Sequence, residues 1–203
     1  MRLGTGGAPM SDIRTVCLYC GSRIGDGGDY EDAAARLGRS LAEAGMRLVF
    51  GGGRVGLMGA AAGAALAAGG EVIGVIPHHL NDVELGMENL SELILVDNMH
   101  QRKRTMFELS DAFVTLPGGV GTLDETFEII SWRQLGLHDK PVILVDHEGY
   151  WQPLLALMNH IVEAGFASDA TSRMYQVVAH VDDVVPTLKK ARAPLIHAAG
   201  DLI

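Results

Sequence analysis

Residues 116–125, LPGGVGTLDE, form the segment with the most evident chemical use. Its glycines, Gly118, Gly119 and Gly121, leave backbone N–H groups open to an anion because no Cβ shields them. An apolar run at 111–115 precedes the segment and apolar residues at helical spacing follow it. We therefore expect a strand that leads through this turn into a helix, whose N-terminus attracts anions. A phosphate group is the expected ligand.

The same residues have a purely structural interpretation. Thr122 and Glu125 have the spacing of a capping box, which would stabilise the start of a helix without any ligand. Two further glycine turns favour a ligand site, because each also follows an expected strand. Residues 51–59 read GGGRVGLMG and residues 20–23 read CGSR. If the strands are parallel, the three turns meet at one edge of the sheet.

A run of cations lies between these motifs, within the segment 99–104, MHQRKR. On a helix, Arg102, Lys103 and Arg104 point about 100° apart, so they cannot all face one pocket. Exposure to solvent is the usual fate of such a run. This helix, however, leads into the strand before the PGG turn, so we expect its first turn near the ligand. A cation there would offset the repulsion between a phosphate and the nearby carboxylates.

The motifs GGGxxGLMG, MHxRK and PGGxGTxxE, in this order and separation, resemble those of the LOG (Lonely Guy) family from about residue 16 to residue 166. Its members are cytokinin riboside 5′-monophosphate phosphoribohydrolases, long mislabelled as lysine decarboxylases. They release free base and ribose 5-phosphate from purine nucleoside 5′-monophosphates. The resemblance implies a homodimer with nucleotide sites near the subunit interface. It also implies that Arg102 and Glu125 are the catalytic pair.

The expected substrate contacts extend beyond that pair. They are Ser22, Glu84, Met99, Arg102, Lys103, Gly118, Gly119, Val120, Gly121, Thr122, Leu123, Asp124, Glu125 and Ser131. Two positions depart from the family pattern. Arg23 stands where a second serine is usual, and Val120 replaces a common tyrosine, so both departures bear on which purine is preferred.

The chemistry of the pair can also be argued from the residues. Breaking a ribosyl C–N bond develops positive charge at the anomeric carbon, which a carboxylate can stabilise or attack through an activated water. Glu125 lies in the expected first helical turn, so we predict that it stays ionised near pH 7. Arg102 does not release its proton under ordinary conditions. We therefore expect Arg102 to hold phosphate or to stabilise the departing purine.

Composition excludes other classes of function. The formal charge of −9 offers no basic stripe for a nucleic acid polymer, and no run reaches the length of a membrane span. No signal peptide is evident, so a cytoplasmic protein is expected. Cys17 and Cys20 form a CxxC, but they lie in and just after a strand, where a redox or metal motif is not expected. His78 and His79 are interpreted as loop histidines, and neither a metal nor a cofactor is expected.

Alternating strands and helices predict an α/β fold, a Rossmann-like, doubly wound and mainly parallel sheet with helices on both faces. Expected strands are 14–19, 46–50, 71–76, 93–96, 112–116, 141–146 and 175–179. Expected helices are 29–44, 56–68, 99–110, 122–135, 150–164 and 182–191. Residues 13–192 would form the single nucleotide-binding domain, between a disordered extension at 1–12 and a tail at 193–203.

Two other functions stay open. Molybdenum-cofactor carrier proteins are similar in fold and bind a phosphate-bearing pterin, but a carrier would not need Arg102 together with Glu125. A lysine decarboxylase would ordinarily need a Schiff-base lysine. The chain has four lysines, of which only Lys103 lies in an expected site, beside arginines that suit phosphate better.

Overall fold

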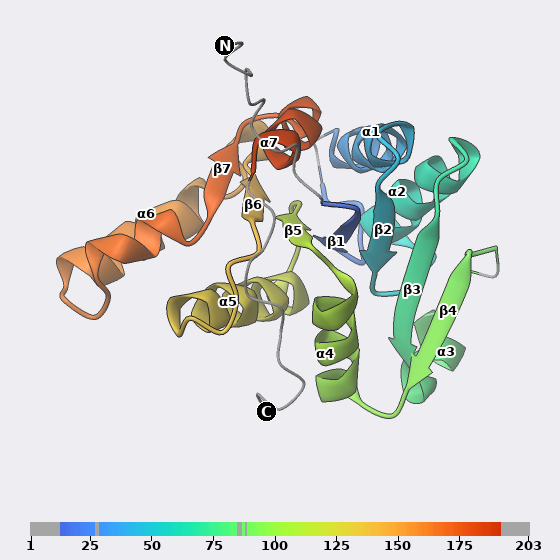
Figure 1. Ribbon diagram of the computed structural model, residues 1–203, viewed down its shortest axis with the longest axis horizontal. Coiled ribbons are helices and arrows are strands. Elements are labelled where there is room, and N and C mark those ends of the chain that lie inside the picture. Colours follow the sequence, from blue (N-terminus) through green and yellow to red (C-terminus); the bar gives the residue numbers. More distant parts are fainter. Residues whose placement is uncertain (1–12, 27–28, 85–86, 88, 192–203) are drawn as a thin grey trace, which may run out of the picture.

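The computed structural model describes residues 13–26, 29–84, 87 and 89–191, with the side chains of 82–84 left aside. The expected terminal extensions, 1–12 and 193–203, lie outside the described residues. Seven strands form one parallel sheet in the order β4-β3-β2-β1-β5-β6-β7 (Figure 1). The strands are β1 (Thr15–Tyr19), β2 (Arg47–Phe50), β3 (Val72–Pro77), β4 (Glu92–Val96), β5 (Ala112–Thr115), β6 (Val142–Val145) and β7 (Gln176–Val178).

Helices connect the strands. They are α1 (Tyr30–Glu43), α2 (Gly56–Ala67), α3 (His78–Glu84), α4 (Met99–Leu109), α5 (Val120–Gln134), α6 (Gln152–Glu163) and α7 (Val184–Lys190), with short 3₁₀ turns η1 (His147–Gly149), η2 (Asp169–Arg173) and η3 (Val181–Asp183). The expected elements are present with shifted ends. One expectation was wrong, because His78 and His79 begin α3 and do not lie in a loop. The seven residues of α3 are too few to show a helical repeat of apolar residues.

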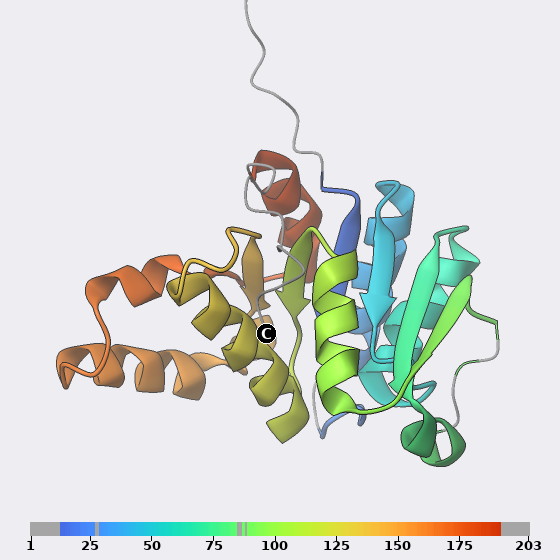
Figure 2. The same cartoon turned by 60° about the horizontal axis from the view of Figure 1, so that its bottom comes forward.

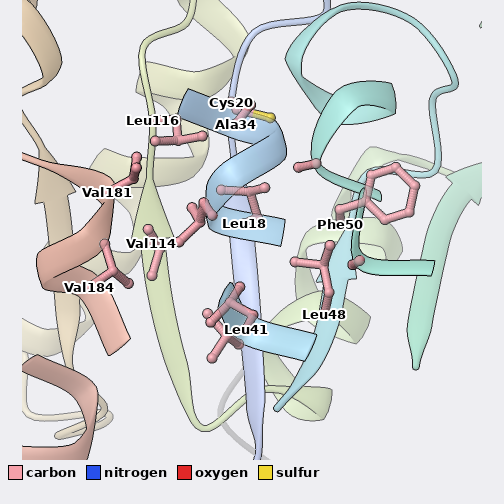
Figure 3. Close-up of a cluster of buried hydrophobic side chains, with 14 of the residues drawn as sticks. Leu18, Cys20, Ala34, Leu41, Leu48, Phe50, Val114, Leu116, Val181 and Val184 are labelled. Carbon is pink, nitrogen blue, oxygen red and sulfur yellow. The ribbon is translucent and has the colours of Figure 1, made fainter. Parts of the chain in front are cut away.

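Helices cover both faces of the sheet because alternate residues of each strand point to opposite sides. Val16 and Leu18 of β1 pack in one core with α1, α2 and α7. Figure 3 shows Leu18 in this core. Cys17 and Tyr19 pack in the other, with α4 and α5, which lie in front of the sheet in Figure 2. The doubly wound arrangement expected from the sequence is therefore confirmed.

Small residues bring α1 and α2 unusually close together. A Cβ on Gly38 would lie 2.0 Å from the carbonyl oxygen of Ala61, so the helix backbones meet where no side chain fits. The abundance of Gly and Ala in the chain therefore serves contact between helices as well as contact with the sheet. In the described part of the chain, no helix has the length and apolar character needed to cross a membrane.

The chain reverses its direction across the sheet at β1. It adds β2, β3 and β4 on one side and then returns to place β5 on the other side of β1. The connections after β1 and β5 therefore lead to helices on opposite faces of the sheet, α1 and α5. In open α/β sheets this switch point is where ligands bind.

Candidate active site

A cavity of about 370 Å³ lies at this switch point, beyond the carboxyl ends of β1, β2 and β5. Its walls come from the three glycine turns and from the first turns of α4 and α5. The lining residues are Leu18, Cys20, Ser22, Arg23, Gly51, Met58, Met99, Arg102, Gly119, Val120, Gly121, Thr122, Asp124 and Glu125.

The three glycine turns contact one another through their backbones. Gly21 donates its N–H to the carbonyl oxygen of Pro117 at 3.0 Å and accepts the N–H of Leu57 at 3.1 Å. Gly56, with φ of +65°, lies so close to Ser22 that a Cβ would come within 2.3 Å of the Ser22 carbonyl carbon. The turns thus meet at one edge of the sheet, as the sequence predicted.

Helix α5 begins two residues earlier than expected, at Val120, with Gly119 as its N-cap. The capping-box interpretation of Thr122 and Glu125 was therefore wrong, because Thr122 is the third residue of the helix. The first N–H groups of a helix have no acceptor within the helix. Residues 119–122 line the cavity, so this helix start provides the backbone donors that an anion needs.

Arg102 is a buried cation, 8% exposed, on the first turn of α4. Asn98 caps that turn by accepting the N–H of Gln101 at 2.9 Å. The Nη2 of Arg102 lies 3.4 Å from the carbonyl oxygen of Gly51 and 3.7 Å from Oε1 of Glu125. Its Nε has no hydrogen-bond partner among the described residues. Arg102 lines the cavity, so its charge is available to a ligand there.

Glu125 is 9% exposed and lies one turn into α5. Burial raises the pKa of its carboxyl to about 7. The charge of Arg102 opposes this shift, and the charge of Asp124 adds to it. The expectation of a fully ionised Glu125 near pH 7 was therefore wrong. The sequence placed it at a helix start, where the dipole favours charge, but loss of water around the carboxyl outweighs that effect. A carboxyl with this pKa can exchange a proton near neutral pH.

The three consecutive cations point in three directions, as their helical spacing predicted. Arg102 faces the cavity, whereas Nζ of Lys103 lies 3.1 Å from Asp124 and 2.9 Å from Glu128. Burial opposes the charge of Lys103, but its contacts with these carboxylates outweigh burial and raise its pKa. Arg104 pairs with Glu108 at 2.8 Å, one turn along the helix. Lys103 thus offsets carboxylate charge beside the cavity.

The structure brings most of the expected contacts together. Those that line the cavity are Ser22, Met99, Arg102, Gly119, Val120, Gly121, Thr122, Asp124 and Glu125. Lys103, Gly118, Leu123 and Ser131 lie outside its lining, and Ser131 is exposed farther along α5. Glu84 ends α3, and its side chain lies outside the described part of the structure.

Sequence reasoning missed five lining residues as contacts. Leu18 lies near the carboxyl end of β1, and Cys20 and Arg23 follow that strand. Gly51 follows β2, and Met58 lies on α2. Four of the five lie in or beside turns that the sequence had already marked. Except for Met58, their common signal is a position at or shortly after the carboxyl end of a central strand.

The cysteines and histidines behave as ordinary structural residues. Cys17 and Cys20 are free and buried in opposite cores, and burial raises the pKa of both thiols. Within the described residues, the group that could hold a metal ion is Asp29, His147 and Glu148, whose ligand atoms lie within 4.8 Å of one another. The Nε2 of His147 already contacts the carboxylate of Asp29, and none of the three residues lines the cavity.

Two relatives show which family this is. A cytokinin riboside 5′-monophosphate phosphoribohydrolase from Rhodococcoides fascians is 43% identical over 87% of this chain and 89% of its own length. A second protein of that name, from Arabidopsis thaliana, is 43% identical over 89% of this chain and 88% of its own. The chain belongs to this family. The resemblance of its motifs to the LOG family is thereby confirmed.

Two other comparisons concern the family and the fold. A family model described as "Possible lysine decarboxylase" matches residues 58–188. The solved structure of a molybdenum-cofactor carrier protein from Chlamydomonas reinhardtii has a TM-score of 0.67, with 22% identity over 88% of this chain and 96% of that one. At that identity the likeness shows a shared fold and nothing about the ligand.

Proposed function

We propose that this member of the LOG family hydrolyses the N-glycosidic bond of cytokinin-type purine nucleoside 5′-monophosphates. The products are free base and ribose 5-phosphate. One observation carries the proposal: a buried arginine and a buried carboxyl, Arg102 and Glu125, share a cavity with the N–H groups that begin α5. The two relatives carry this activity in their names.

Each part of the cavity has a task in this reaction. The N–H groups of residues 119–122 bind the 5′-phosphate, and this remote binding energy orients the ribose. Glu125 in its ionised form stabilises the positive charge at the anomeric carbon or takes a proton from the attacking water. Arg102 keeps its proton and stabilises either the phosphate or the departing purine. Asp124 does not repel the phosphate at full strength because Lys103 pairs with it.

The charge on Lys103 argues against a decarboxylase. A Schiff-base lysine must lose its proton, which requires a lowered pKa. The two carboxylates beside Lys103 raise its pKa instead. A non-catalytic carrier of a phosphate-bearing pterin would use the same helix start, but it gives no role to the buried pair of Arg102 and Glu125.

Measuring base release tests the proposal. The protein is incubated with AMP, GMP, CMP and isopentenyladenosine monophosphate, and free base is followed by chromatography. We expect release from the purine monophosphates and little from adenosine, because a nucleoside lacks the phosphate that orients the sugar. Equal turnover of AMP and adenosine would contradict the phosphate site. Binding of AMP without any release would favour a carrier.

We further propose that the protein acts as a cytoplasmic homodimer without a nucleic acid partner. Large apolar side chains are exposed at the end of α5, on α6 and just after α6: Leu135, Leu157 and Phe166. In Figure 1, the helix α6 extends away from the sheet. A second copy that covers these side chains would remove them from water. Light scattering coupled to size-exclusion chromatography tests this, with a monomeric mass as the contrary result.

A further inference from the structure

A tyrosine outside the cavity holds the loop that binds the phosphate. The hydroxyl of Tyr150 donates a hydrogen bond of 2.7 Å to the carbonyl oxygen of Gly118. Tyr150 lies between η1 and α6, beyond β6, and does not line the cavity. Gly118 immediately precedes Gly119, the N-cap of α5.

Because of peptide geometry, this contact influences the orientation of the Gly119 N–H group. The Gly118 carbonyl and the Gly119 N–H belong to one peptide unit, which is planar and trans. In a trans unit the C=O and N–H bonds point in opposite directions. A hydrogen bond that draws the Gly118 oxygen toward Tyr150 therefore directs the Gly119 N–H away from Tyr150. Gly119 lines the cavity, so its orientation affects how an anion is bound there.

Tyr150 is itself held in place by its neighbours. Its ring meets Tyr30 edge-on at 5.8 Å and Trp151 at 4.7 Å between ring centroids. The N–H of Trp151 donates to the carboxylate of Asp146 at 2.7 Å, which fixes the loop after β6. The hydroxyl of Tyr150 is therefore presented by an ordered loop, although the residue is 38% exposed.

The glycine loop is clamped from a second direction. The N–H of Gly21 donates to the Pro117 carbonyl at 3.0 Å, one residue before the contact with Tyr150. Gly118 also packs closely against α5, because a Cβ on it would lie 2.2 Å from Oγ1 of Thr122. The segment before α5 is thus held between the loop after β1 and the loop after β6.

We propose that Tyr150 is a positioning residue for phosphate recognition. It acts through the Gly118–Gly119 peptide and does not touch the substrate. The proposal rests on the function proposed above, because it assumes that the start of α5 binds the 5′-phosphate. It assigns to Tyr150 an effect on the binding of phosphate-bearing ligands, with little effect on the chemical step.

The test compares Tyr150→Phe with the unchanged protein. Phenylalanine keeps the ring contacts and removes only the hydroxyl. Loss of one hydrogen bond is expected to raise KM for AMP about three- to tenfold, with kcat changed less than about twofold. The dissociation constants of AMP and of inorganic phosphate, measured by calorimetry, should rise by the same factor. The dissociation constant of adenosine should not change.

Tyr30→Phe is the matched control. It removes a hydroxyl from the neighbouring ring, and that hydroxyl makes no hydrogen bond to another described residue. We expect this variant to keep the wild-type KM and dissociation constants. Unchanged AMP and phosphate binding in Tyr150→Phe would overturn the proposal. Equal weakening of AMP and adenosine would also overturn it, because it would indicate a general structural defect.

Calorimetry separates this proposal from the proposed function. If the unchanged protein binds AMP without releasing adenine, hydrolysis is refuted. In that case the ratio of AMP dissociation constants between Tyr150→Phe and the unchanged protein still decides the role of Tyr150. If adenine is released and that ratio is one, hydrolysis stands and the role of Tyr150 is refuted.

Discussion

Two glycine loops with similar sequences line the cavity, and their glycines serve different purposes. In the loop after β2, a Cβ on Gly51 would lie 1.9 Å from Nη2 of Arg102. In the loop after β5, a Cβ on Gly119 would meet nothing within 4 Å. Gly51 thus makes room for a cation of the protein itself, whereas Gly119 leaves a helix start open to a ligand. A glycine-rich turn after a strand therefore does not by itself identify a phosphate loop.

The two loops also differ in the polar group that they present. The first offers the carbonyl oxygen of Gly51 to Arg102, and the second offers N–H groups at the start of α5. A carbonyl attracts a cation and an N–H group attracts an anion. The two loops thus offer opposite polarity to one cavity, which Glu125 also lines, 3.7 Å from Arg102. Each prediction below changes one side of this arrangement.

The largest effect is expected for Glu125→Gln, which keeps the size of the side chain and removes its charge and proton exchange. We expect kcat for AMP to fall about 10²- to 10⁴-fold, the range typical of a lost acid–base group. The melting temperature should not fall, because α5 begins at Val120 and does not use Glu125 as a capping box. Retained turnover would return Glu125 to a structural role.

Arg102→Ala comes next. Removing the cation should lower kcat/KM for AMP about 10²-fold, as for other lost electrostatic contacts to a reacting group. Arg102→Lys should recover only part of the loss, because an ammonium cannot form the paired contacts of a guanidinium. The measurement is steady-state kinetics with AMP. Full activity in Arg102→Ala would show that the backbone N–H groups at the start of α5 are sufficient for catalysis without the guanidinium.

Gly51→Ala and Gly119→Ala test the contrast between the loops directly. The alanine at 51 meets the mobile end of Arg102, so we expect a folded protein with kcat/KM lowered about tenfold. In an Arg102→Ala background the same change should have little further effect. Gly119→Ala should keep the melting temperature of the unchanged protein, and any loss of activity should persist in the Arg102→Ala background. Additive losses for Gly51→Ala would contradict the role given to Gly51.

The smallest effect concerns stability and pH. The pKa of Glu125 is about 7 in the folded protein and lies near 4.5 when unfolded, so the folded state binds the proton more tightly. The contribution of Glu125 to the free energy of unfolding is therefore fully present below the unfolded pKa and is lost as pH rises through the folded pKa, about 7. Between pH 6 and pH 8 the contribution of Glu125 should fall by about 1 kcal/mol. Urea unfolding of Glu125→Gln should lack this part of the pH dependence, and an identical dependence in both proteins would refute it.

Much of the fold could be predicted because its signals are local. Apolar runs such as 46–50 followed by glycine turns predict parallel strands joined by helices, and the structure confirms the sheet. Helix α3 escaped prediction because His78–Glu84 is too short to show periodicity. Ser131 was expected at the site, but it lies exposed on α5, outside the lining of the cavity. The sequence of a helix does not show which of its faces will turn toward a cavity.

The sequence by itself determined the order of the motifs, the doubly wound fold and the meeting of three glycine turns, because parallel strands deliver their following loops to one edge. Only the tertiary structure decided which charged groups are buried, which are paired and how their pKa values shift. Packing of α4 against the loop after β2 buried Arg102 and left Lys103 to pair with Asp124 and Glu128. Burial of Glu125 raised its pKa, although its position near a helix start predicted the opposite. Desolvation depends on every atom around a group, and those atoms come from segments far apart in the sequence.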